Sequence, residues 1–292
     1  MFHLNLSNAD VRVHALASGS SGNAFLVQAG TTSLLLDAGL SQRMLASHLA
    51  RFGVGAAGLT AILLTHEHVD HSASAGAMSR RATAPVVANA ATLQAASQRS
   101  EQAFAACELA TGSERGFGCI GVRSFAVPHD AAEPVGYVLE IGRQRIVYCT
   151  DVGSVTPEIR AALKGASLVI VEANHDLAWL LRGPYTPDMK ERVSSPTGHL
   201  SNADCADLIT YRLIEGGSLT IWLAHLSRVN NSPALARRSV LARIAAQTRV
   251  PLALEIALRD HPSVSWRSGS MAVQPSFDFQ AETAHETDIE GR

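Results

Sequence analysis

Four side chains that commonly bind metal ions lie close together in the run HEHVDH, residues 66–71. His66 and His68 follow an apolar run with the pattern of a strand, and in extended backbone such side chains point to one side. They can therefore share one ion. Asp70 and His71 follow where the chain turns towards a helical pattern, so they suit a second, adjacent ion. A metal commonly offsets the cost of burying such groups; the alternative is a solvated, histidine-rich turn.

The elements that must position these side chains alternate along the chain. Apolar runs rich in β-forming residues predict strands at 11–16, 24–27, 33–36, 61–64, 122–127, 135–141, 145–149, 168–172 and 219–224. Helical patterns occupy 43–52, 73–81, 92–104, 157–164, 202–213 and 233–248. This alternation predicts an α/β fold in which helices cover sheet faces, with function collected at strand ends.

The run from His66 to His71 resembles the HxHxDH signature of the metallo-β-lactamase superfamily. The resemblance implies the metallo-β-lactamase fold, an αββα sandwich of two mixed β-sheets flanked by helices. Asp37, at the end of a strand-like run, resembles the early aspartate that orients ligands from behind them. Its alternative role is to cap a turn after the strand.

Three later residues match the remaining ligands of the superfamily: His129, Asp151 and His225. The resemblance implies that one ion binds His66, His68 and His129, that the other binds Asp70, His71 and His225, and that Asp151 bridges them. Nitrogen and oxygen ligands suit zinc or manganese, and the sequence does not choose between them. Two such ions can activate a water for attack on phosphorus or a carbonyl, so Asp70 is a catalytic as well as a ligating candidate.

Over residues 17–231 the chain is similar to the bacterial YycJ/WalJ group of exonucleases with this fold. The similarity rests on the runs SGSSGN (18–23), HDA (129–131), TDVG (150–153), EANHD (172–176), GHLSN (198–202) and HLSRVNN (225–231). The chain departs from the group at Ala24, where a cysteine is expected, and at Thr186, which separates Tyr185 from Pro187. The resemblance implies a metal-dependent phosphodiesterase that degrades DNA from a 5′ end.

Glu172 and His199 resemble a pair that nucleic-acid-processing relatives place beside the metals, where it is thought to pass a proton to the leaving group. The alternatives are a surface carboxylate and a histidine at the start of a helix. His175 is either a further site residue or a contact at a helix N-terminus.

Two stretches could contact phosphates. The first is the glycine- and serine-rich run that contains Ser20, Ser21 and Asn23, although a tight turn explains it equally well. The second, residues 216–254, has no Asp or Glu but several arginines, and a solvated helix face is the alternative. The candidate substrate contacts from this second stretch are Arg228, Asn231, Arg237 and Arg238, with Arg243 and Arg249 nearby.

Composition sets the remaining limits. The chain has 292 residues, 47% of them apolar, which predicts one domain over residues 1–267 and a disordered tail over 268–292. The last four residues, IEGR, resemble a protease cleavage tag.

A net charge of −2 gives no overall attraction to nucleic acid. No secretion signal or membrane span is visible, which predicts a cytoplasmic protein, and the four scattered cysteines predict buried, reduced thiols.

Two other functions remain open. The same metal pair could serve a small-molecule hydrolase that acts on a cyclic nucleotide or a thioester, or the chain could be a non-catalytic regulatory protein. The intact ligand set argues against the second. The segment from His129 to Asp151 is too short for the tRNA-binding arm of tRNA endonucleases, and that from Asp151 to His225 is too short for a β-CASP domain.

Overall fold

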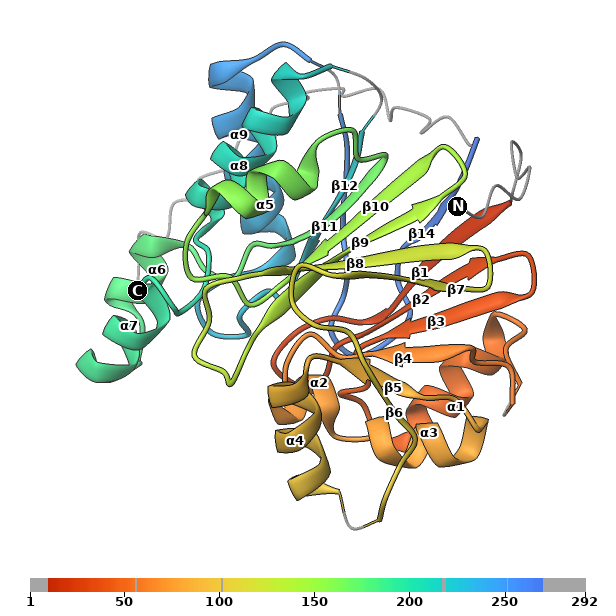
Figure 1. Ribbon diagram of the computed structural model, residues 1–292. Coiled ribbons are helices and arrows are strands. Elements are labelled where there is room, and N and C mark those ends of the chain that lie inside the picture. The colour runs from red at the N-terminus through yellow and green to blue at the C-terminus, as the bar shows by residue number, and fades with distance from the viewer. Residues whose placement is uncertain (1–9, 56, 101, 217–218, 251, 270–292) are drawn as a thin grey trace, which may run out of the picture.

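Two seven-stranded β-sheets pack face to face in the computed structural model (Figure 1), which describes residues 10–55, 57–100, 102–216, 219–250 and 252–269. In spatial order the first sheet contains β14 (Ser265–Arg267), β1 (Val11–Ala17), β2 (Ala24–Ala29), β3 (Thr32–Leu36), β4 (Ala61–Leu63), β5 (Val86–Ala88) and β6 (Ala106–Glu108). The second contains β13 (Ala253–Ile256), β12 (Thr220–Ala224), β11 (Leu168–Glu172), β10 (Gln144–Cys149), β9 (Val135–Ile141), β8 (Ile120–Ala126) and β7 (Glu114–Phe117).

Both sheets are mixed. In the first, β14 to β3 pair antiparallel and β3 to β6 pair parallel. In the second, β7 to β10 pair antiparallel and β10 to β13 pair parallel. Strands β3 and β4 therefore end at one edge of their sheet, and β8, β10, β11 and β12 end at one edge of theirs. The residues that follow these strands supply the site.

The continuous apolar strands follow from burial on both faces. In β3, Leu34 and Leu36 belong to the core between the sheets, whereas Leu35 belongs to the core beneath the helices. Successive side chains of a strand point to opposite faces of the sheet, so neighbouring leucines enter different cores. A strand that is apolar throughout therefore indicates that both faces of its sheet are covered. Tyr137 and Trp222 add large buried side chains to the central layer.

Helices cover the outer face of each sheet. On the first lie α1 (Gln42–Arg51), α2 (Val69–Ser72), α3 (Ala75–Ala82) and α4 (Ala90–Arg99), and on the second α5 (Pro157–Leu163), α8 (Asn202–Ile214) and α9 (Pro233–Gln247) (Figure 1). These layers confirm the predicted αββα sandwich.

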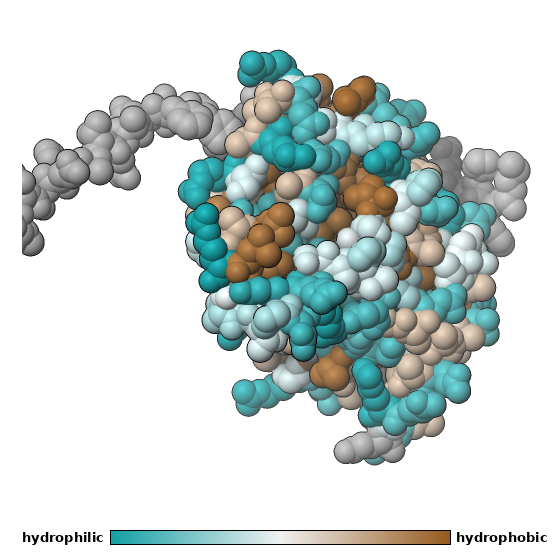
Figure 2. Space-filling view, turned by 90° about the vertical axis from the view of Figure 1, so that its left-hand side faces the viewer, coloured by the Kyte–Doolittle hydropathy of each residue, from teal (hydrophilic) through white to brown (hydrophobic). Residues whose placement is uncertain are grey.

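Two shorter helices, α6 (Leu177–Arg182) and α7 (Pro187–Ser194), lie beside the second sheet at the left of Figure 1. Leu177, Trp179 and Leu181 of α6 are about half exposed, at 51%, 47% and 60%. Figure 2 shows this side of the molecule, where separate apolar patches lie in a mainly hydrophilic surface.

The predicted strands and most helices are found within a few residues of their expected bounds. The helix expected over 92–104 instead ends at Arg99. Strands β5, β6 and β14 and helix α2, each of three or four residues, were not predicted because such short runs give no measurable periodicity. Strands β7 and β13 and helices α6 and α7 were missed as well.

The single domain over residues 1–267 stays a prediction, and residues 270–292, with the terminal IEGR, lie outside the described residues. Among the described helices, none has the length and apolar character needed to cross a bilayer. All four cysteines are free thiols, but only Cys149 and Cys205 are buried, so the expectation of burial was wrong for Cys107 and Cys119.

Candidate metal centre

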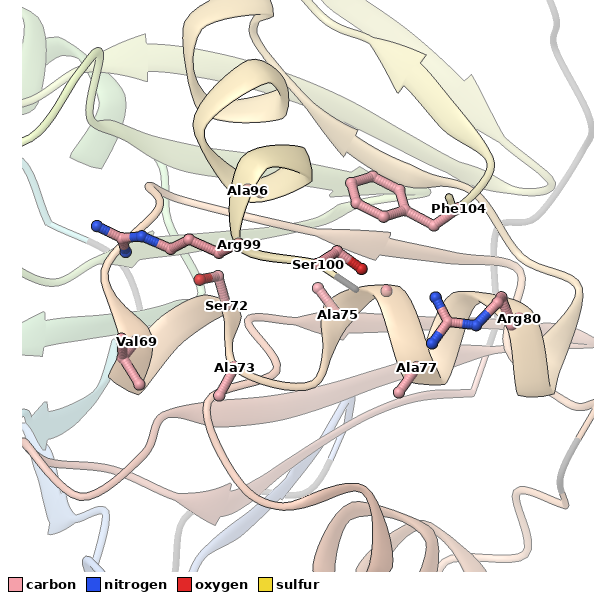
Figure 3. Close-up of a pocket in the computed structure, with 11 residues that line it drawn as sticks. Val69, Ser72, Ala73, Ala75, Ala77, Arg80, Ala96, Arg99, Ser100 and Phe104 are labelled. Atoms are coloured by element: carbon pink, nitrogen blue, oxygen red, sulfur yellow. The ribbon is translucent and has the colours of Figure 1, made fainter. Parts of the chain in front are cut away.

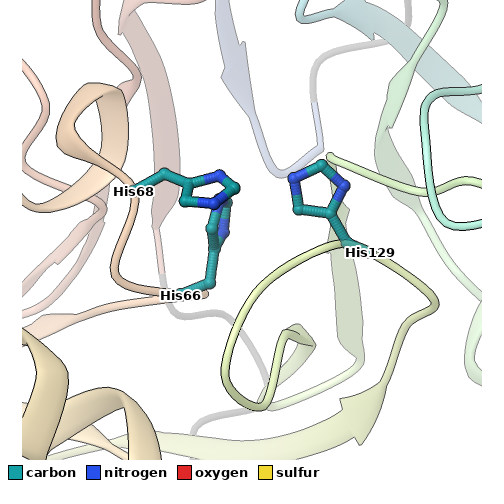
Figure 4. Close-up of side chains that lie close together, drawn as sticks. All are labelled: His66, His68 and His129. Carbon is teal, nitrogen blue, oxygen red and sulfur yellow. The ribbon is translucent and has the colours of Figure 1, made fainter. Parts of the chain in front are cut away.

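The run from His66 to His71 bends from an extended loop into a helix. It follows β4, and His68 is the N-cap of α2, so His66 lies in the loop before the helix while Asp70 and His71 lie within it. Figure 4 shows the imidazoles of His66 and His68 facing that of His129. One ligating atom from each of these three histidines lies within 4.8 Å of the other two. A metal ion fits among such atoms.

A second group lies beside the first. Ligating atoms of Asp70, His71 and His225 also lie within 4.8 Å of one another. Asp151 lies between the groups: its Oδ2 is 3.0 Å from Nε2 of His71, and its Oδ1 is 3.7 Å from Nε2 of His129. The structure thus brings together all seven residues predicted to bind metal.

Left-handed backbone turns several of these side chains into the site. Among the described residues, four that are not glycine have positive φ, and three of them lie within two residues of the end of a strand at the site: Asp37 (58°), Asp151 (57°) and His225 (51°). This conformation costs free energy for residues with a Cβ, and it persists where the surroundings enforce it. Strain is therefore concentrated at this site.

Buried hydrogen bonds fix the histidine rings. Nδ1 of His71 donates to Oδ2 of Asp37 over 2.7 Å, which turns Nε2 of His71 towards Asp151. Nδ1 of His129 donates to the carbonyl oxygen of Gly198 over 3.1 Å. Such partners fix the tautomer and leave the other ring nitrogen for a metal.

Glu172 holds two further rings with a single oxygen. Its Oε1 accepts from Nδ1 of His199 and from Nδ1 of His225, each over 2.8 Å. Its Oε2 accepts from the backbone N–H groups of Val152 and Leu200. Burial raises the pKa of Glu172, but His199, through its charge and hydrogen bond, and His225 lower it to about 2. Glu172 is fully buried and bound by four donors, so it positions other groups, whereas the side chain of His199 is 20% exposed. The proton relay through this pair stays a prediction.

Unsatisfied buried atoms test whether a metal fits. Nε2 of His66, Nε2 of His129 and Oδ2 of Asp151 are buried, and no hydrogen bond to the described residues satisfies them. Orphaned buried polar atoms are rare in folded proteins because each costs free energy. Here three of them converge from separate elements, which is the arrangement that cations would satisfy.

The charges of the site are strongly coupled. Burial lowers the pKa of His66 well below its usual value, and the nearby His71 lowers it further. Burial also lowers the pKa of His225, but Asp151, Asp70 and Glu172 outweigh it and raise that pKa to about 10. The carboxylates thus provide the negative charge that a pair of cations would neutralise.

Comparison with known proteins places this architecture in a family. The model of the beta-lactamase superfamily domain matches residues 32–210. The chain belongs to the beta-lactamase superfamily. It is 37% identical over 230 residues to the exodeoxyribonuclease YycJ of Bacillus anthracis, covering 77% of this chain and 86% of that protein. It is 35% identical over 247 residues to the exodeoxyribonuclease WalJ of Streptococcus pneumoniae, covering 82% and 90%.

The fold is also shared with solved structures of the superfamily. The metallo-beta-lactamase fold protein YhfI of Bacillus subtilis superposes with a TM-score of 0.65 at 17% identity, covering 89% of this chain and all of that one. At this level of identity the likeness concerns the fold alone.

Within this superfamily member, the glycine- and serine-rich run is a turn between β1 and β2. Ser20 and Ser21 are exposed, and Ser21 donates to Asp260. Asn23 is fully buried, where its Oδ1 accepts from the backbone N–H of Gly19 and its amide lies 3.0 Å from Nε2 of His71. The side chain of Asn23 thus ties the turn to the metal-ligand run, and a phosphate contact of this run stays a prediction.

The predicted basic surface is largely occupied by internal contacts. Arg237 donates from Nη1 to the carbonyl oxygen of Leu254 in β13. Arg243 makes two 2.7 Å hydrogen bonds to Asp207. Arg228 lies 3.8 Å from Asp260, and Arg238 is exposed. A shared phosphate-binding role for these arginines is not supported by this arrangement.

Two polar residues expected near substrate are buried instead. The amide of Asn231 donates to the carbonyl oxygens of Ala173 and Asn174, and to Asn202. His175 is 2% exposed and forms an isolated β-bridge with Ser201. These contacts argue against a direct role of Asn231 in substrate binding and place His175 inside the scaffold.

Sequence reasoning missed residues that support the site from behind. The Thr65 backbone N–H donates to Oδ1 of Asp37, and the Tyr148 hydroxyl donates to Oδ2 of Asp37 over 2.8 Å. Thr65 directly precedes the histidine run, so its position in the sequence could have suggested a role at the site. No sequence feature pointed to Tyr148, because it lies far from Asp37 in sequence and on the other sheet.

Proposed function

We propose that this chain is a two-metal phosphodiesterase that removes nucleotides from a 5′ end of DNA. The observation that carries the proposal is the convergence of seven ligand-type side chains, three with orphaned buried atoms, at one edge of the sandwich. The 35–37% identity to proteins named exodeoxyribonucleases supports DNA as the substrate.

Two divalent ions, zinc or manganese, would be held by His66, His68 and His129 and by Asp70, His71 and His225, with Asp151 shared. When bound, such a pair lowers the pKa of a water molecule and stabilises charge on the phosphate. The protein's part is to hold the ligands in fixed orientations, through Asp37 behind His71, Gly198 behind His129 and Glu172 behind His225.

His199 is the residue that we assign to the leaving group. Its Nδ1 is held by Glu172, which leaves Nε2 to donate a proton to the sugar oxygen as the P–O bond breaks. The partial exposure of His199 allows contact with substrate, which the buried Glu172 cannot make. We also propose a cytoplasmic location, which the free thiols support.

The test uses purified protein with Mn²⁺ or Zn²⁺ and DNA labelled at either the 5′ or the 3′ end. The proposal expects early release of labelled mononucleotide from 5′-labelled DNA and slow shortening of 3′-labelled DNA. His68→Ala and Asp151→Ala should abolish release and lower the metal content, with the melting curve retained.

Three results would overturn the proposal. Hydrolysis of bis(p-nitrophenyl) phosphate without hydrolysis of DNA would indicate a small-molecule hydrolase. Preferred hydrolysis of RNA would change the substrate. Absence of turnover with either metal, in protein shown to bind metal, would indicate a regulatory role.

A further inference from the structure

A pocket of about 380 Å³ lies among α2, α3 and α4, behind the metal-ligand run (Figure 3). Helix α2 separates the two sites: Asp70 and His71 belong to the metal centre, whereas Val69 and Ser72 line the pocket. The volume falls in the range of small-ligand sites, about 300–1,000 Å³.

The pocket is built against the metal-ligand run. Arg99, in its wall, donates from Nη1 to the carbonyl oxygen of Glu67. Ser72 donates to the same carbonyl over 2.8 Å and to that of His68 over 3.0 Å. Val69, next to His68, is 65% exposed at the pocket's edge. A strand whose end lies at the metals can therefore reach the pocket by crossing Val69.

The lining of the pocket is positively charged. Arg80 and Arg99 both line it, and the described lining residues include no carboxylate. Each guanidinium has five N–H donors, and the described hydrogen bonds use only Nη1 of each, to Gln102 and Ala103 for Arg80 and to Glu67 for Arg99. Donors therefore remain on both arginines, which lie at opposite ends of the pocket (Figure 3), and a guanidinium is well suited to phosphate oxygens.

An aromatic ring and a glycine shape the other wall. A Cβ placed on Gly76 would lie 2.7 Å from Oγ of Ser100, 3.1 Å from the ring of Phe104 and 3.4 Å from Nη1 of Arg80. These groups therefore converge over Gly76, where the lack of a side chain keeps the space open. An aromatic face beside a cation is a suitable surface for a nucleobase and its phosphate.

We infer that this pocket binds one nucleotide of the DNA strand, with its base against Phe104 and one phosphate at Arg80. Arg99, at the opposite end of the pocket beside the metal-ligand run (Figure 3), would contact the adjoining phosphate. The inference rests on the proposed nuclease function. The pocket would bind the DNA strand beside the metal centre, a role for which Arg237 and Arg243 of α9 are not free.

Two variants test the pocket. Arg80→Gln removes one cation, and Ala77→Phe fills the space from the same face of α3 without changing charge, since Ala77 also lines the pocket. The matched control is Arg81→Gln, which removes the same charge one position further along α3 and outside the lining. Melting curves and metal content should be recorded for all three.

We expect both pocket variants to raise KM for a single-stranded 12-mer by about tenfold, and to lower the ratio of DNA to bis(p-nitrophenyl) phosphate turnover. Arg80→Gln should also lower the slope of log affinity against log salt by about 0.7. Arg81→Gln should keep KM, ratio and slope near those of the parent protein. The preference for the 12-mer over a dinucleotide should fall only in the pocket variants.

The outcomes distinguish failure of the proposed nuclease function from failure of the pocket inference. If the parent protein does not hydrolyse DNA, the proposed function fails. If it does, and Arg80→Gln and Ala77→Phe behave like Arg81→Gln, the pocket inference alone fails. If the pocket variants weaken inhibition by free dAMP but leave KM for the 12-mer unchanged, the pocket binds released nucleotide and the strand-binding inference is overturned.

Discussion

Oδ2 of Asp37 lies 2.7 Å from Nδ1 of His71, and both side chains are fully buried. Burial lowers the pKa of His71, but the charges of Asp151 and Asp37 raise it well above its usual value. Since Asp37 accepts a hydrogen bond from Nδ1, it holds a proton on that nitrogen and turns Nε2 towards Asp151. This arrangement matches the carboxylate–histidine pairs that stand behind metal ions in other proteins.

Asp37→Asn should lower the affinity for metal by about 10- to 100-fold, because the amide no longer fixes the ring of His71. Competition with a chelator of known affinity measures the change. Tyr148→Phe is the matched control, since it removes a hydrogen bond to the same Oδ2 but leaves the carboxylate in place. Equal metal affinity in Asp37→Asn and the parent protein would refute the positioning role.

His199→Ala and Glu172→Gln should differ, because Glu172 holds His225 as well as His199. His199→Ala should keep its metal and slow DNA hydrolysis by about 10² to 10⁴, with a smaller loss on bis(p-nitrophenyl) phosphate, whose leaving group needs no proton. Glu172→Gln should lose metal affinity in addition. Metal content and turnover on both substrates should be measured for the two variants. Equal metal content in both variants would contradict the role of Glu172 in holding His225.

The unfolding free energy should depend on His14. Burial, reinforced by the charge of Arg12, lowers the pKa of His14 to about 4, and its ring stacks on Phe52 at 3.9 Å. The unfolded chain then binds more protons than the folded one, so stability is lost as the pH falls from about 6.5 to about 4.

His14→Phe, which keeps a ring for stacking, should reduce this loss by about 1–2 kcal/mol. Urea unfolding of both proteins at pH 7.5 and pH 4.5, with EDTA present to remove the metal contribution, gives the comparison. A parallel pH dependence in the two proteins would show that His14 does not titrate on unfolding.

Thiol reactivity should divide the cysteines into two pairs. Burial raises the pKa of Cys149 and of Cys205, and nearby carboxylates add to the rise, whereas Cys107 and Cys119 are partly exposed. Since the thiolate is the reactive form, DTNB should label the second pair in the folded protein and all four in urea. Mass spectrometry of the labelled peptides identifies the sites, and rapid labelling of Cys149 in the folded protein would be the contrary result.

The sandwich and the converging ligands were predicted from the resemblance to the metallo-β-lactamase superfamily, and local patterns supported both. Apolar runs mark strands buried on two faces, and the parallel strands deliver the residues that follow them to one edge. His129, Asp151 and His225 match the remaining ligands of the superfamily, and each follows such a run. Their left-handed backbone conformations and shared partners depend on the assembled fold.

Side-chain partners across the fold were not predictable in this way. Arg237 and Arg243 lie in a stretch without acidic residues, but their partners come from β13 and from α8. Asn23 and Asn231 were predicted as possible substrate contacts, yet both residues are buried. Local sequence specifies where a strand ends but not which distant carbonyl or carboxylate an exposed-looking side chain will meet.

The first sheet is completed by the last strand that the structure describes. Strand β14 pairs with β1 through Arg12, Val13 and His14, so residues from the two ends of the described chain lie side by side. During synthesis, the hydrogen-bonding edge of β1 therefore stays unpaired until residue 267 has left the ribosome. An open edge of this kind can pair with another chain, so a nascent or truncated product that ends before β14 is the form most exposed to aggregation.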